Sequence, residues 1–228
     1  MLVLCLLALL PVTAPGANIP SLRQARDQQD RAVLARIAAQ RGDAAAKTPT
    51  DAKAQYSAAL AASYVAEVAQ ELHDKSGAYA AAVSGMPFAE RAVALKPDSS
   101  EFNRILGTLC GQAISGNGLA ALKYGKCALE NVNKAIELDP KSSGAYVSRG
   151  VGNFYLPTAF GGGVDVALKD FQKAIELNPR SAEAYIWLGV AQRKANRPAD
   201  ARNAFEKALE LNPNRLWARQ QLDKTPRP

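Results

Sequence analysis

Three consecutive glycines in the segment "YLPTAFGGG" (155–163) are the first candidate for chemistry, because glycine-rich loops before a helix can hold phosphate through backbone N–H groups. A Walker-type loop would need Lys and then Ser or Thr after the last glycine, and Val164 and Asp165 stand there instead, which excludes nucleotide-triphosphate binding in that form. Two alternatives remain. A structural corner is favoured, because Asp165 can cap the next helix itself. The other alternative is a small-ligand turn made of Phe160, Gly161, Gly162 and Gly163.

The other residues that could carry catalysis or bind a metal are few. His73 is the only histidine, which excludes a two-histidine metal site, and its place before "DKSG" is typical of a helix end. The three cysteines form no Cys-x-x-Cys motif. We therefore predict no catalytic residue, no metal site and no cofactor, and a protein that is not an enzyme.

Cys110 and Cys127 raise the separate question of a disulfide. If the chain turns near Gly116, the helical rise places the two residues at levels about 7 Å apart, which is outside easy bridging distance. We therefore favour two small apolar core residues, with a disulfide as the alternative.

Helices must position all these side chains, because the chain repeats one helical pattern that ends each time at a proline. The segment "NKAIELDPKSSGAY" (133–146) recurs as "QKAIELNPRSAEAY" (172–185) and "EKALELNPNRLWA" (206–218), with a weaker copy at 90–102. The prolines that close the copies stand at 97, 140, 179 and 213, with successive spacings of 43, 39 and 34 residues. Strand-like alternation is nowhere sustained.

The last unit, 182–215, resembles the tetratricopeptide repeat, a helix-turn-helix unit of about 34 residues. The residues at the positions that define the repeat are Tyr185, Leu188, Gly189, Ala201, Phe205, Ala208 and Pro213. Earlier units keep most of these residues but carry insertions in their turns. The resemblance implies an all-α, right-handed superhelix of antiparallel helix pairs, since a single pair cannot bury its apolar face.

The predicted organisation has five parts. Residues 1–17 are a signal peptide, and 18–50 hold an N-terminal polar helix and linker, with the helix at 20–42 and the linker at 42–52. A divergent pair follows at 51–98, and we expect Gly85 and Pro87 to interrupt its second helix. Three repeats occupy 99–215, and 216–228 form a C-terminal capping helix and tail.

The same resemblance implies a concave groove lined by the first helix of each unit. Its expected partner-binding side chains are aromatic at the centre and basic at one end. They are Arg104, Val151, Phe154, Tyr155, Trp187 and Arg193. The alternative for Phe154 and Trp187 is burial inside the superhelix or under the cap. The family's carboxylate clamp of lysines, asparagines and arginine is missing, so binding of chaperone tails is not expected.

The N-terminal run "MLVLCLLALL" predicts export. It is too short to span a bilayer, which takes about 20 residues, but it has the length of a signal-peptide core. An uncleaved anchor and a cytosolic protein are the alternatives, because no Lys or Arg precedes Arg23. We expect a periplasmic or secreted protein without an integral span after signal removal. The net charge of +7 is interleaved with acids, so nucleic acid is not an expected partner.

A second, weaker resemblance concerns the corner. The segment "YLPTAFGGG" followed by "ALKDFQKAIELNP" is similar to exported bacterial repeat proteins with a Phe-Gly-Gly turn, including those that accompany tripartite periplasmic transporters. We therefore predict a non-catalytic interaction module or scaffold of the bacterial envelope, which binds a protein or peptide and can join an envelope complex. The alternative is a small-ligand-binding component of a periplasmic transport system.

Overall fold

The computed structural model describes residues 21–114 and 118–227, which form helices and no strands. The predicted signal peptide at 1–17 and Cys5 lie outside these residues. None of the helices in the two described ranges is long and apolar enough to cross a membrane. The helices are α1 (Leu22–Asp27), α2 (Arg31–Lys47), α3 (Ala52–Glu71), α4 (Lys75–Leu95), α5 (Ser100–Ile114), α6 (Gly118–Leu138), α7 (Ser143–Tyr155), the short 3₁₀ helix η1 (Thr158–Phe160), α8 (Val164–Leu177), α9 (Ala182–Lys194), α10 (Pro198–Leu211) and α11 (Leu216–Asp223).

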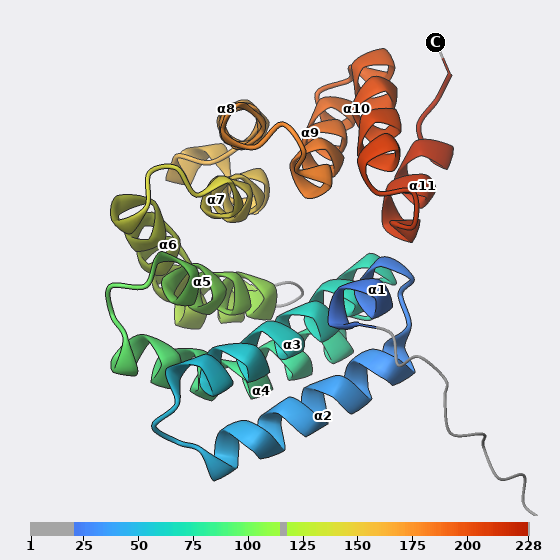
Figure 1. Ribbon diagram of the computed structural model, residues 1–228. Coiled ribbons are helices and arrows are strands. Elements are labelled where there is room, and N and C mark those ends of the chain that lie inside the picture. The colour runs from blue at the N-terminus through green and yellow to red at the C-terminus, as the bar shows by residue number, and fades with distance from the viewer. Residues whose placement is uncertain (1–20, 115–117, 228) are drawn as a thin grey trace, which may run out of the picture.

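The helices stack as consecutive antiparallel pairs, α3 with α4, α5 with α6, α7 with α8 and α9 with α10 (Figure 1). In each of the last three pairs the first helix lies towards the centre of the molecule and the second lies outside it. The array curves so far that α1 comes to lie near α11. The predicted all-α, right-handed superhelix of antiparallel helix pairs is confirmed.

The repeated motif forms the same turn in successive units. The side chain of Asp139 accepts a hydrogen bond from the N–H of Lys141 at 3.0 Å, and Ser142 then caps α7 by accepting one from the N–H of Ala145 at 3.3 Å. Such caps satisfy backbone donors that a helix start leaves without partners. In the next copy Asn178 accepts the same bond from the N–H of Arg180, and Ser181 accepts it from the N–H of Ala184.

The single helix predicted for 20–42 is wrong. The chain breaks after α1, where Gln29 has a positive φ of 54°. Asp30 then starts α2 by accepting a hydrogen bond from the N–H of Val33 at 3.0 Å. Helix α2 continues through most of the expected linker to Lys47, because Gly42 costs only about 1 kcal/mol inside a helix and the alanines after it favour helix.

The expected interruption of the second helix in the 51–98 pair is also wrong, because α4 runs without a break past Pro87. Proline removes one backbone donor from a helix, but Met86 and Ala89 on either side lie in the core. Gly85 serves this packing, since a Cβ there would lie 2.5 Å from the Cβ of Ala62. Packing of the buried face therefore overrides the local preference.

One glycine in the inner helix allows close approach within each of the last two pairs. A Cβ on Gly150 would lie 2.5 Å from the ring of Phe171, and one on Gly189 would lie 2.7 Å from the ring of Phe205. Both rings are fully buried. These residues occupy the glycine and aromatic positions of the repeat pattern, so the pattern reflects a direct contact between the two helices of a pair.

We expect Gly150→Ala to lower the free energy of unfolding by about 1–3 kcal/mol, because the added methyl group overlaps Phe171 in a close-packed core. The matched control is Gly152→Ala in the same helix, where a Cβ meets no atom within 4 Å. That change should raise stability by about 0.5–1 kcal/mol, because glycine is unfavourable inside helices. Chemical denaturation measures both values, and equal effects would contradict the close-contact interpretation.

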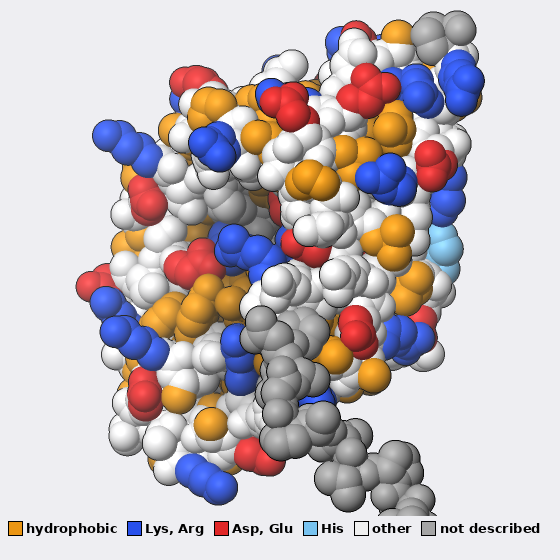
Figure 2. Space-filling model, turned by 45° about the vertical axis from the view of Figure 1, so that its right-hand side comes forward, with side chains coloured by type: hydrophobic (Ala, Val, Ile, Leu, Met, Phe, Trp, Pro, Cys, Tyr) orange, Lys and Arg blue, Asp and Glu red, His pale blue; other side chains and the backbone are white. Residues whose placement is uncertain are grey.

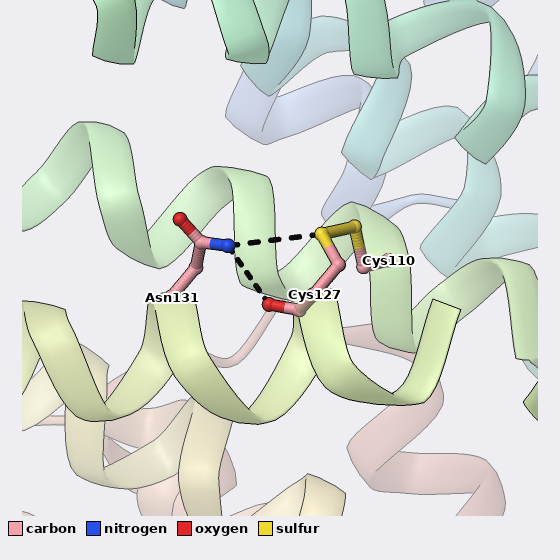
Figure 3. The surroundings of a disulfide bond; sticks show 3 residues. All are labelled: Cys110, Cys127 and Asn131. Carbon is pink, nitrogen blue, oxygen red and sulfur yellow. Dashed lines mark hydrogen bonds between the residues drawn. A yellow bond between two sulfur atoms is a disulfide. The ribbon is translucent and has the colours of Figure 1, made fainter. Parts of the chain in front are cut away.

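Cys110 and Cys127 form a disulfide that joins α5 to α6, with their Cα atoms 6.0 Å apart (Figure 3). The favoured prediction of two separate core cysteines is therefore wrong. The error lay in the expected register of α5 against α6. Gly107 on α5 faces the Ala128 carbonyl and Val132 on α6. Cys110 lies three residues closer to the turn than Gly107, so it is level with residues 125–129. Asn131 donates to the Cys127 carbonyl at 2.9 Å on the same helix.

Removal of the disulfide should destabilise the protein without changing its helix content. The bond closes a loop across a sequence separation of 17, for which chain entropy predicts about 3 kcal/mol of stabilisation. We expect the double variant Cys110→Ser with Cys127→Ser to melt at a lower temperature, and reductant to shift the wild type to the same value. A melting temperature unaffected by both would show that the bond contributes nothing.

Candidate functional site

The candidate site is the surface that α5 and α7 turn towards the centre of the superhelix. Its residues follow helical spacing on each helix, and we call them the inner face: Arg104, Thr108 and Gly111 on α5, with Ser148, Val151 and Tyr155 on α7. The two rows meet where the hydroxyls of Thr108 and Ser148 are 3.1 Å apart. A Cβ on Gly111 would meet no atom within 4 Å, so this surface is open above small side chains.

Arg104 is the charged residue of the inner face and is already held by its neighbours. Its Nη2 lies 2.5 Å from Glu101 Oε1, which also accepts a hydrogen bond from the Tyr56 hydroxyl at 2.7 Å. Burial works to lower the pKa of Arg104, but its bonds with Glu101 outweigh burial, so the pKa lies above its usual value. Burial and the Glu101 charge both raise the pKa of Tyr56. The guanidinium therefore stays ionised and oriented.

The aromatic residues expected in the groove divide between core and surface. Phe154 is only 8% exposed. Trp187 lies between the rings of Phe171 and Trp217, at centroid distances of 6.2 and 5.1 Å, so it joins the last repeats to the cap. Tyr155, in contrast, is 69% exposed and remains on the inner face.

Arg193 holds the capping helix. Its guanidinium donates to the Gln221 carbonyl at 3.1 Å and to the Thr225 hydroxyl at 3.3 Å, and it lies over the ring of Phe205. Burial lowers the pKa of Arg193. The expected basic end of the groove is therefore used inside the molecule.

The superhelix is closed by a cluster of charges that sequence reasoning missed. Arg215, directly before α11, is 0% exposed. It binds Glu183 of α9 at 2.9 Å, Glu67 of α3 at 2.8 Å, and Glu71 of α3. Arg26 of α1 also pairs with Glu183, at 2.9 Å. We call the contacts between α1–α3 and α9–α11 the ring seam.

The carboxyl groups of the ring seam differ in pKa. Burial raises the pKa of Glu67 to about 7, although the charges of Arg26 and Arg215 oppose the shift. Burial also raises the pKa of Glu71, against Arg215. For Glu183 burial acts in the same direction, but the charges of Arg215 and Arg26 outweigh it and lower the pKa to about 2. One carboxyl therefore exchanges its proton near neutral pH while another stays ionised.

One signal in the sequence could have pointed to the seam. Arg215 stands at the position that Ser142 and Ser181 occupy in the earlier copies, where serine caps the next helix. At the start of α11 no side chain caps the backbone. A residue that breaks a local rule often serves a contact elsewhere.

The glycine corner uses its own backbone donors. The N–H groups of Gly161, Gly162 and Gly163 donate to the carbonyls of Thr158, Pro157 and Asn153 at 3.0, 3.2 and 2.8 Å. Those three N–H groups are therefore occupied inside the turn, which supports the corner over an anion-binding turn. Phe160 is 75% exposed, so the corner does not bury its aromatic side chain.

We expect Gly162→Ala to destabilise the protein, because the added Cβ would lie 2.3 Å from the backbone oxygen of Leu156. The loss should reach about 1–3 kcal/mol. Phe160→Ala, in the same corner, should leave thermal stability within about 0.5 kcal/mol, as for other exposed positions. A stable Gly162→Ala variant would refute the tight-corner interpretation.

The described residues offer no other chemistry of note. No group of His, Cys, Asp and Glu among them could hold a metal ion. His73 is exposed and lies in the turn after α3 with a φ of 61°. Figure 2 shows basic and acidic side chains intermixed over one face, without a large patch of one sign. The expectation that nucleic acid is not a partner rests on the intermixing of basic and acidic residues along the sequence.

A superhelix of paired helices with an inner face defines the class of helical-repeat proteins. Similarity to known proteins indicates which repeat this is. The model of a family described as "Tetratricopeptide repeat" matches residues 160–215. No curated protein matches the sequence. The solved structure of TTC0263, a thermophilic TPR protein of Thermus thermophilus, is 18% identical with a TM-score of 0.60, over 88% of this chain and 97% of its own.

A second similar structure is the HusA haemophore of Porphyromonas gingivalis, 19% identical with a TM-score of 0.58, over 78% of this chain and 96% of its own. At such identities the likeness concerns the fold alone. The family match identifies residues 160–215 as tetratricopeptide repeats, and the described residues share the fold of a solved tetratricopeptide repeat protein.

Proposed function

We propose that this protein is a non-catalytic interaction module that binds a segment of a protein or peptide on its inner face. The observation that carries the proposal is the open surface between α5 and α7, where a Cβ on Gly111 would meet no atom within 4 Å and the exposed ring of Tyr155 offers apolar contact. Arg104 adds an oriented charge beside this surface. Aromatic and arginine side chains of this kind dominate binding energy in interfaces.

The proposed site is smaller than the groove expected from the resemblance. On α9 the positions that would continue it are used in the seam and under the cap: Glu183 binds Arg215, and Trp187 packs on Trp217. A partner is therefore expected to contact α5 and α7 and to end before α9.

We propose further that the protein works in the bacterial envelope or outside the cell. Two observations support this location. The disulfide between Cys110 and Cys127 belongs to oxidising compartments, and the apolar run at the N-terminus has the length of a signal-peptide core. An envelope complex is the setting in which we expect the partner.

A small-ligand role in a transport system has less support. Its motivation was the glycine corner, whose three glycine N–H groups are used internally. A thermal-shift screen against carboxylates and phosphates addresses it, because a specific ligand raises the melting temperature by mass action.

A bulky residue on the inner face tests the proposed function. We expect Gly111→Phe to keep the helical content, because the position is helical and open, and to abolish capture of the partner from a native envelope extract. The matched control is Gly125→Phe on α6, the outer helix of the same pair, where a Cβ also meets no atom within 4 Å.

Mass spectrometry identifies the proteins that the wild type and the two variants each capture. A protein retained by the wild type and Gly125→Phe but lost with Gly111→Phe supports the inner face. Equal capture by all three forms would contradict it.

A further inference from the structure

The ring seam is held by polar side chains, and no hydrophobic cluster of the described residues crosses it. Every hydrophobic cluster of the described residues lies on one side of the seam, within α1–α3, α3–α6, α7–α9 or α9–α11. Across the seam Gln220 donates to Gln29 at 2.9 Å, and Asn212 donates to Asp27 at 2.9 Å. Since apolar burial is the main stabilising term in packed interfaces, the seam lacks the kind of contact that would hold it closed most firmly.

The charges of the seam are not balanced. Around the guanidiniums of Arg26 and Arg215 lie four carboxyl groups: Asp27, Glu67, Glu71 and Glu183. Closure brings α1 and α3 against α9 and α11, so it concentrates these acids in a buried place. Removing charges from water costs nearly as much free energy as their pairing returns, and excess negative charge adds repulsion. Arg23 lies nearby as a third cation, so the four carboxylates exceed the cations by one, and one bound proton removes that excess.

We propose that the ring seam is a gate beside the inner face, which closes when the seam binds a proton and opens when it releases the proton. The proposal rests on the proposed function, because the gate regulates access to that surface. Opening separates α1 and α3 from α9 and α11 and leaves each helix pair intact, since the apolar clusters do not cross the seam.

Glu67 is the group that takes up the proton. Its Oε1 lies 2.8 Å from Arg215 and 3.5 Å from Arg26. Other titratable or charged groups surround these three residues on the elements packed together there. They are Arg23 and Asp27 of α1, Tyr64 and Glu71 of α3, and Glu183 of α9.

The sign follows from the two states of Glu67. Its pKa is about 7 in the closed ring and returns towards the ordinary 4.5 when the opened seam exposes it to water. The closed ring therefore binds more protons at Glu67, so the contribution of Glu67 to closure is fully present below pH 4.5 and is lost as pH rises through 7. Glu183 has the opposite shift, so its contribution is present above pH 4.5 and is lost as pH falls towards 2. Closure is thus expected to be greatest in mildly acidic solution.

Small-angle X-ray scattering of the full chain tests the gate without any partner. From about pH 6 to about pH 8.5 we expect the radius of gyration to increase with a midpoint near pH 7, while far-UV circular dichroism stays constant. Glu67→Gln should remain closed across the range, because its side-chain oxygen still accepts from Arg215 and it has no proton to lose. Arg215→Gln should be open throughout.

The matched control is Glu137→Gln, which removes an exposed carboxyl on α6 that is paired only with Lys134. It should show the wild-type pH response. A radius of gyration that does not change with pH in the wild type, or that changes equally in Glu67→Gln, would overturn the gate. Because no partner is present, failure of the gate leaves the Gly111→Phe comparison unaffected, and the reverse also holds.

Discussion

The ends of a stacked helix array are the constraint on which this structure depends. A helix pair buries one apolar face within itself and leaves another that only a neighbouring pair can cover. At the C-terminal end α11 covers the last pair, with Trp217 against Trp187. At the N-terminal end α1 and α2 cover α3, with Leu34 and Ile37 in the shared cluster. Side chains that would line a groove in the middle of an array are therefore core residues at its ends.

This constraint explains which parts of the site could be predicted from the sequence. The repeat pattern encodes contacts within a pair, such as Gly150 with Phe171, so it predicted the fold. It is silent about the ends, where Arg193 and Trp187 contact a helix that has no counterpart in the repeat. The disulfide was missed for another reason, because its presence depends on helix register.

The ring seam was beyond the repeat pattern altogether. Repeat periodicity describes neighbours along the superhelix, and the seam joins the two ends of the chain, as in the bond from Arg215 to Glu67. Nothing periodic relates these positions. The polar nature of the seam has a physical consequence. An apolar seam would join the two ends into one core, whereas the desolvation cost of buried ion pairs offsets much of the free energy that their pairing returns.

The inner face lies beside the covalent link between α5 and α6. Gly111, the open floor of the site, directly follows Cys110, whose disulfide joins α5 to α6. On the opposite row, the Ser148 hydroxyl lies 3.4 Å from Nη1 of Arg104, whose guanidinium Glu101 also binds. A surface whose side chains are already ordered loses little entropy when a partner binds. The floor and the polar seam thus have separate physical origins: the floor depends on the disulfide and on the two apolar clusters that α5 and α7 join, and the seam depends on charges that the floor does not share.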